Sequence, residues 1–119
     1  MDGEGRGSVD LNDPQYERGK LEIVKHSQAL DAARANGNRL EAGRQLLNLG
    51  VAYLSHIGQP KLAIEHYEQA LIIFREVNDP GEEANVLGRL GEAYMFLKDL
   101  KRAVEYYEQA LVICRKLGD

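Results

Sequence analysis

The stretch AIEHYEQAL, Ala63–Leu71, returns forty residues later as AVEYYEQAL, Ala103–Leu111. Seven of the nine positions are identical. A segment that recurs at a period of about 20–50 residues is one structural unit laid down again. The chain is therefore predicted to be a repeat protein, in which each unit buries its apolar face against its neighbours.

A third, weaker copy precedes these two. The stretch KLEIVKHSQAL from Lys20 aligns with KLAIEHYEQAL from Lys61. Asp13 and Pro14 suit a helix N-cap and a first helical position, but nothing before Lys20 matches the first helix of a repeat. Residues 13–37 are therefore predicted to be an N-terminal half-repeat, a second helix without its first.

Two capping-box-like helix starts lie one repeat apart, at Asn38 with Glu41 and at Asp79 with Glu82. Each opens a stripe of apolar residues at three- and four-residue spacings, which is typical of an amphipathic helix. The sequence predicts an all-α fold of five helices, at about residues 20–36, 38–57, 60–77, 80–97 and 100–117. Short connections favour stacked antiparallel hairpins, with full repeats at 38–78 and 79–119.

The apolar stripes also predict the core. In the first helices the expected core residues are Ala42, Leu46, Leu49, Tyr53 and Ile57, then Ala84, Leu87, Leu90, Tyr94 and Leu97. In the second helices they are Ala63, Tyr67, Ala70, Leu71, Phe74 and Val77, then Ala103, Tyr107, Ala110, Leu111, Cys114 and Leu117. Cys114 is the single cysteine, so no intrachain disulfide is expected. A buried thiol in a reducing, cytoplasmic compartment is the simplest interpretation.

Composition bounds the class of protein. Hydrophobic residues make up 44% of the chain and charged residues 29%, as in ordinary globular proteins. A formal net charge of −4 argues against nucleic acid as a partner, and no apolar run is long enough for a membrane span. Residues 1–12 are rich in glycine and lack apolar periodicity, so they are interpreted as a disordered lead-in or a cloning remnant.

Motifs in both full copies resemble the tetratricopeptide repeat. Each first helix carries Leu-x2-Leu-Gly-x2-Tyr, and each second helix carries Ala-x3-Tyr-x2-Ala. They start at Leu46 and Ala63 in one copy, and at Leu87 and Ala103 in the other. The glycines and alanines let helices approach closely, and the tyrosines fill the remaining space. The resemblance implies a right-handed solenoid of two and a half repeats.

The repeats depart from the family pattern because they are longer than its usual length of about 34 residues. Long repeats of this kind resemble those of kinesin light chain, of spindle adaptor proteins and of bacterial signalling proteins. The last two residues, Gly118 and Asp119, occupy the slot of Asn78 and Asp79, where a repeat begins. This interpretation leaves open that the chain is a fragment of a larger signalling protein.

The resemblance implies a protein–protein interaction scaffold whose first helices line a concave groove for a partner peptide. Carried over by register, the groove positions are Arg44, Leu47, Asn48, Val51, Ser55, Asn85, Gly88, Arg89, Glu92 and Phe96. The arginines and asparagines could receive an acidic side chain or a C-terminal carboxylate. The alternative is a solvated polar face with weak links to Glu92.

A second hypothesis is structural. The last helix would have an uncovered apolar face, and Val112 and Leu117 on it are expected to promote homodimerisation. No catalytic, cofactor-binding or metal site is predicted, and an enzyme is not expected. The histidines His26, His56 and His66 fall on different helices and form no ligand motif; His26, in a tyrosine slot, is expected to be packed or half-buried.

Overall fold

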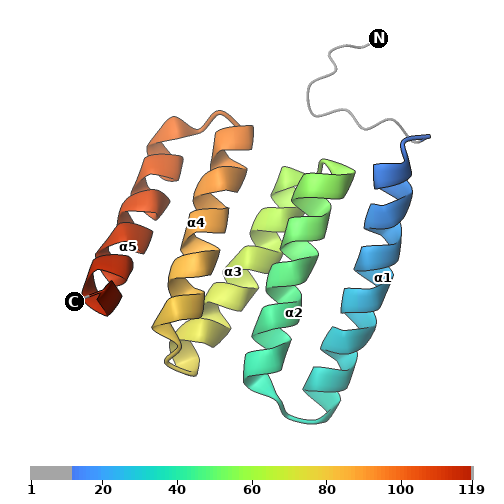
Figure 1. Cartoon of the computed structure of the whole chain (residues 1–119), viewed down its shortest axis with the longest axis horizontal. Coiled ribbons are helices and arrows are strands. Elements are labelled where there is room, and N and C mark those ends of the chain that lie inside the picture. Colours follow the sequence, from blue (N-terminus) through green and yellow to red (C-terminus); the bar gives the residue numbers. More distant parts are fainter. Residues whose placement is uncertain (1–11, 119) are drawn as a thin grey trace.

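The computed structural model describes residues 12–118, so the expected lead-in lies outside the described residues except for Asn12. Its helices are α1 (Pro14–Ala35), α2 (Arg39–Ala52), α3 (Pro60–Glu76), α4 (Pro80–Phe96) and α5 (Leu100–Gly118), with a π-helical turn η1 (Tyr53–Ile57) that continues α2. Consecutive helices run antiparallel, side by side (Figure 1). The all-α prediction is thus confirmed for the described part, which contains no strand.

The predicted caps at Asn38 and Asp79 form, and Asp99 caps the last helix in the same way. The side chains of Asn38, Asp79 and Asp99 each accept a hydrogen bond of 3.1 Å from the backbone N–H three residues on. These bonds satisfy N–H groups that have no partner within the helix. The backbone turns left-handed at Gly37 and Gly58, with φ of 69° and 72°, and each helix stops there.

Helix α1 begins at Pro14, the start that Asp13 and Pro14 indicated, and not at the predicted bound of about residue 20. Asp13 caps it by accepting a 2.9 Å hydrogen bond from the N–H of Gln15. Gly19 continues the helix instead of breaking it, because α1 and η1 meet there. A Cβ on Gly19 would lie 2.5 Å from the Cβ of His56, so only glycine allows this approach.

The turn η1 explains why the first helices recur at a spacing one residue longer than the second helices. The spacing from Tyr53 to Tyr94 is one residue longer than the spacing from Gly58 to Lys98. Gly58 and Lys98 are the left-handed residues that follow these two tyrosines. The additional residue therefore falls between Tyr53 and Gly58. A π-helical turn absorbs one residue without ending the helix, and η1 occupies that place.

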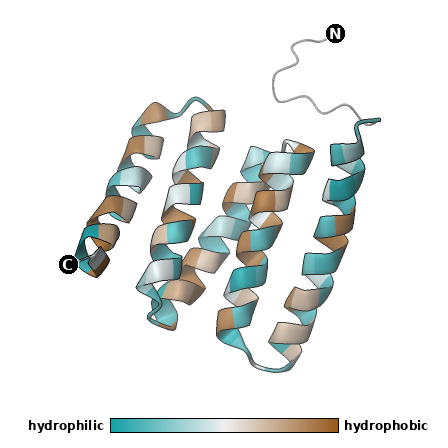
Figure 2. Ribbon diagram, viewed as in Figure 1, coloured by the Kyte–Doolittle hydropathy of each residue, from teal (hydrophilic) through white to brown (hydrophobic). Residues whose placement is uncertain are grey.

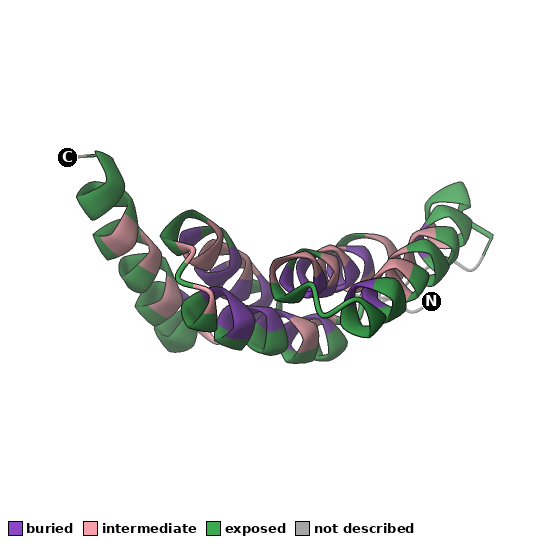
Figure 3. Cartoon of the chain, turned by 90° about the horizontal axis from the view of Figure 1, so that it is seen from below, coloured by how far each residue is buried: buried purple, intermediate pink, exposed green. Residues whose placement is uncertain are grey.

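The core runs through the row of helices, between neighbours. The largest fully buried side chains are Tyr67, Phe74, Leu46, Leu87, Leu90 and Val86. Packing is almost entirely between elements adjacent in sequence, as in a solenoid. The principal extents are 48 × 37 × 20 Å, and the buried residues face inward between the helices (Figure 3).

Each hairpin closes on a glycine–tyrosine contact, as the sequence predicts. A Cβ on Gly50 would lie 2.3 Å from Cε1 of Tyr67, and a Cβ on Gly91 would lie 2.7 Å from Cε1 of Tyr107. The absence of a side chain thus makes room for the ring. Stacked rings repeat in the same register: Tyr53 lies on His66 at 5.1 Å between centroids, and Tyr94 lies on Tyr106 at 5.5 Å.

Of the predicted core residues on the last helix, Ala103 is buried and Ala110 packs against the core, but the predicted burial of the others is wrong. Cys114 is exposed, and Tyr107, Leu111 and Leu117 are 38%, 50% and 55% exposed. The reason is the absence of a neighbour: α4 covers the corresponding face of α3, whereas among residues 12–118 nothing packs on that face of α5 (Figure 3). Leu97, at the α4–α5 turn, is also more exposed than predicted, at 37%.

Candidate functional site: the concave surface

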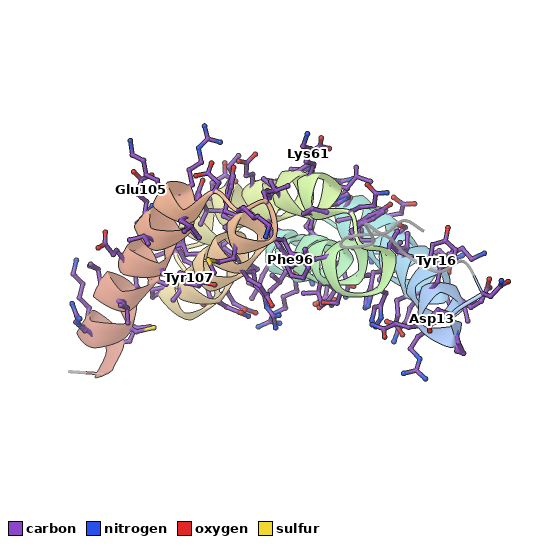
Figure 4. The ribbon with its side chains drawn as sticks, turned by 90° about the horizontal axis from the view of Figure 1, so that it is seen from above. Asp13, Tyr16, Lys61, Phe96, Glu105 and Tyr107 are labelled. Atoms are coloured by element: carbon purple, nitrogen blue, oxygen red, sulfur yellow. The ribbon has the colours of Figure 1, made fainter. Side chains whose placement is uncertain are left out.

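The row of helices is curved, and α2 and α4 lie on its inner side while α3 lies on its outer side (Figure 3). Lys61 on α3 and Glu105 on α5 mark the outer side of the curve, whereas Phe96 on α4 and Tyr107 on α5 lie on the other side (Figure 4). The first helices of the two repeats therefore form the concave surface. This is the arrangement that the predicted groove residues require.

The predicted groove positions differ in accessibility. The side chains of Arg44, Ser55, Asn85 and Phe96 are exposed, and those of Asn48, Val51, Arg89 and Glu92 are half-buried. Leu47 is the exception: it is only 7% exposed and belongs to the hydrophobic core. Leu47 therefore cannot supply a substantial apolar contact to a ligand, and Val51 and Phe96 remain as the apolar positions.

Two of the predicted polar residues converge on Glu82, which the sequence analysis assigned only to a helix cap. The Nε of Arg44 lies 3.1 Å from Oε2 of Glu82, and Nδ2 of Asn85 donates to Oε1 of the same carboxylate at 3.3 Å. The Arg44–Glu82 contact joins α2 to α4 across the concave surface, whereas Asn85 and Glu82 both belong to α4. The pair shows that Arg44 and Asn85 can hold one carboxylate together, and here that carboxylate belongs to the chain itself.

Asn48 belongs to a second network, which reaches α1. Its Nδ2 lies 3.5 Å from Oε1 of Gln45, and that oxygen lies 2.7 Å from Nδ1 of His26. The other ring nitrogen of His26 is 3.0 Å from Oε1 of Glu22. His26 is therefore a half-buried side chain within a hydrogen-bond network, as its register predicted.

Arg89 is more weakly held than Arg44. Its Nη1 lies 3.6 Å from Oε1 of Glu92, one turn further along α4, and the two side chains are 41% and 46% exposed. An exposed pair at this distance contributes little, about 0–1 kcal/mol. A ligand carboxylate can therefore compete for Arg89.

A hollow of about 440 Å³ opens on α4 beside α5, and we call it the Gly88 hollow. Its lining consists of Ala84, Asn85, Gly88, Arg89, Glu92 and Tyr107. Nothing lies within 4 Å of the place where a Cβ on Gly88 would be. The hollow thus brings together four predicted groove residues from the second repeat. It leaves Arg44 and Asn48 outside, and it includes Tyr107, which the sequence pattern assigned to the core.

Tyr67 lies close to the charged residues of this surface. Burial raises its pKa from 10.0 to about 12; the positive charge of Arg89 opposes the shift and the negative charge of Glu92 adds to it. Its hydroxyl is buried and has no hydrogen-bond partner among the described residues. A buried hydroxyl without a partner is unfavourable.

Metal ligation finds no support in the part of the chain that the structure describes, which holds no group of three or more His, Cys, Asp or Glu side chains suited to an ion. His66, for example, stacks on Tyr53, and its Nδ1 lies 2.8 Å from the carbonyl oxygen of Leu62. No helix within residues 12–118 has the length and apolarity needed to cross a membrane.

Comparison with known families gives two matches. Residues 45–81 and residues 84–117 each match a model described as tetratricopeptide repeat. A comparison with curated protein sequences finds no significant match. The matched segments carry the glycine–tyrosine contacts and the residues of the Gly88 hollow, whereas Arg44 and Glu82 lie just outside them. The chain therefore belongs to the tetratricopeptide repeat family, whose repeats mediate protein–protein interaction and scaffolding.

Proposed function

We propose that the chain is an interaction module that binds a peptide segment of a partner protein on the concave surface of α2 and α4. The observation that carries this proposal is the Gly88 hollow, an open space beside Arg89, Asn85 and Glu92. Phe96, on the same helix, is 56% exposed and offers an apolar contact. Helices packed on both sides hold these groups in place, which lowers the ordering cost of binding.

Arg89 gives the proposed ligand its chemistry. Arg44 already holds Glu82 at 3.1 Å, whereas the Arg89–Glu92 pair is longer and half-exposed. A guanidinium can receive a carboxylate through two parallel hydrogen bonds, and Asn85 lines the same hollow. The proposed ligand is therefore a peptide that presents an acidic side chain or a C-terminal carboxylate.

The test is a charge reversal at Arg89. Peptides selected from a displayed library with free C-termini would be compared with their amidated or Glu-to-Gln versions by fluorescence polarisation. We expect R89E to weaken the acidic peptide at least about tenfold, the cost of a lost charged hydrogen bond, and the neutral version much less. K61E, the same charge change on the outer side, should leave both unchanged. Equal losses for both peptides in R89E would defeat the charge argument.

A second candidate function is self-assembly through α5. Val104, Leu111, Val112 and Leu117 are 51%, 50%, 48% and 55% exposed, and hydrophobic bands recur along α5 (Figure 2). Exposed apolar side chains gathered on one helix favour association.

Light scattering after size exclusion, over a hundredfold concentration range, tests this candidate. We expect a mass that rises with concentration and a double variant, V112K with L117K, that stays monomeric. L21K is the control, because Leu21 is 71% exposed at the other end of the row. A wild-type mass that stays at 13.3 kDa throughout would exclude self-assembly.

A further inference from the structure

A second hollow, of about 330 Å³, lies where the end of α1, the start of α2 and the middle of α3 meet. Much of its lining is apolar and comes from Ala33, Ala42, Leu46, Ile72 and Ile73, and Arg34 borders it as well. We call it the Arg34 pocket. It shares no residue with the Gly88 hollow. Ile72 beside it is 58% exposed, so an apolar surface is open to solvent there.

The internal repeat shows what this place lacks. One repeat period along the chain brings Arg34 onto Arg75 and Ala42 onto Glu83. At the α3–α4 junction, Nε of Arg75 lies 2.9 Å from Oε2 of Glu83. At the α1–α2 junction the methyl group of Ala42 stands in place of that carboxylate. Among residues 12–118, the guanidinium of Arg34 has no ion-pair or hydrogen-bond partner.

The same period places Ala33 on Phe74. Phe74 is fully buried at the second junction, so that junction has an aromatic ring and a carboxylate where the first has two alanines. The hollow at the first junction coincides with the loss of both larger side chains. Arg39, which also borders the pocket, is paired with Glu76. The free positive charge at the pocket is therefore that of Arg34.

We propose that the Arg34 pocket binds a segment of a partner protein in which a large apolar side chain is followed by Asp or Glu. The apolar side chain would enter the space between Ala33, Ala42 and Ile72. The carboxylate would pair with Arg34, in the role that Glu83 has for Arg75 at the next junction. Charge complementarity and the apolar lining together select this occupant, and the site is independent of the concave surface.

The test uses two small probes, N-acetyl-phenylalanyl-glutamate amide and its glutamine analogue, titrated to millimolar concentration into nitrogen-15-labelled full chain. We expect chemical-shift changes at the amides of Ala33, Gly37 and Ala42. The glutamate probe should bind about threefold more tightly than the glutamine probe, the size of an exposed ion pair. Absence of binding, equal affinities, or shifts confined to the Gly88 hollow would overturn the proposal.

Variants identify the charge. R34Q, an exposed position, should leave binding of the glutamine probe intact and remove the preference for glutamate. R75Q is the matched control one repeat further on, and it should keep the preference. A42E supplies the missing carboxylate within the chain and should abolish binding of the glutamate probe. A preference for the glutamate probe that survives R34Q would contradict the assignment of the charge to Arg34. Because R34Q is an exposed substitution, it keeps the test valid even if A42E alters the fold.

The result is separable from the proposed groove function. R89E changes only the concave surface, so it should leave both probes unaffected at the Arg34 pocket. Loss of probe binding in R89E would overturn the separate-site proposal. Conversely, failure of the probes to bind would leave the peptide measurements on Arg89 unaffected.

Discussion

Gly50 and Gly91 occupy the same register in the two repeats, yet their surroundings differ. Each glycine faces a tyrosine ring that fills the space left by its missing side chain. Tyr67, against Gly50, is fully buried, whereas Tyr107, against Gly91, is 38% exposed. The two glycines are therefore constrained to different degrees. The freedom of the facing tyrosine ring decides how much stability an added methyl group removes.

We expect G50A to destabilise the chain by about 1–3 kcal/mol, because the buried ring of Tyr67 cannot move away from the new methyl group. G91A should stay within about 0.5 kcal/mol of wild type, since the ring of Tyr107 can rotate into solvent and alanine favours the helix. Urea unfolding followed by circular dichroism measures both. Equal losses would show that α5 holds Tyr107 as firmly as α4 holds Tyr67.

Tyr67 also predicts a dependence of stability on pH. Its pKa in the folded chain, about 12, lies above the ordinary 10.0, so losing the proton favours unfolding. The contribution of Tyr67 to stability is complete below pH 10 and is lost as the pH rises towards 12. Y67F should reduce this alkaline loss. At pH 7 it should be as stable as wild type, or up to about 1 kcal/mol more stable, because the removed hydroxyl is buried without a partner.

Urea titrations at pH 7 and pH 11 compare Y67F with wild type and with Y107F, the change at the half-exposed counterpart. A loss of more than about 1 kcal/mol at pH 7 in Y67F would show that the hydroxyl has a partner after all.

At the scale of the helix, α5 shows how burial depends on a neighbour as well as on sequence. It repeats α3 at seven of nine positions between Ala103 and Leu111, yet Ala103 is its only buried residue, whereas α3 has seven. The amphipathic pattern was therefore sufficient to predict the helix. It could not show whether another element covers the apolar face, because that depends on what packs there.

Cys114 provides the measurement for this element. Because its thiol is exposed on α5, it should react with Ellman's reagent in the folded chain within about tenfold of its rate in urea. A matched control is A70C in a C114S background, since Ala70 is fully buried on α3 and a thiol there should react far more slowly. A native rate for Cys114 as slow as that control would mean that the face of α5 is covered in solution.

Across the whole molecule, local signals predicted more than long-range ones. Caps such as Asn38 and the glycine–tyrosine contacts depend on short spacings and repeat register, and both were confirmed. The partner of Arg44 was missed, because Glu82 lies 38 residues away on α4 and only the fold brings the two side chains together. Leu47 was placed in the groove by register alone, and its burial follows from packing that register does not specify.

The balance of charge on the concave surface also depends on how the helices pack together. Sequence register placed two arginines there, Arg44 and Arg89, and suggested a basic site. The structure brings Glu82 and Glu92 to the same two guanidinium groups, so the surface is close to neutral when it is empty. Binding of an acidic peptide then requires exchange of one carboxylate for another at Arg89, so we expect selectivity to depend on a carboxylate placed at Arg89 more than on the net charge of the peptide.

The π-helical turn at Tyr53–Ile57 has a genetic consequence. It corresponds to one additional codon, present in one copy of the repeated segment and absent from the other. Because the turn absorbs the additional residue, Gly58 takes the same left-handed place in its repeat as Lys98 takes in the next. A difference of one codon at this place is therefore compatible with the same helical hairpin in both copies.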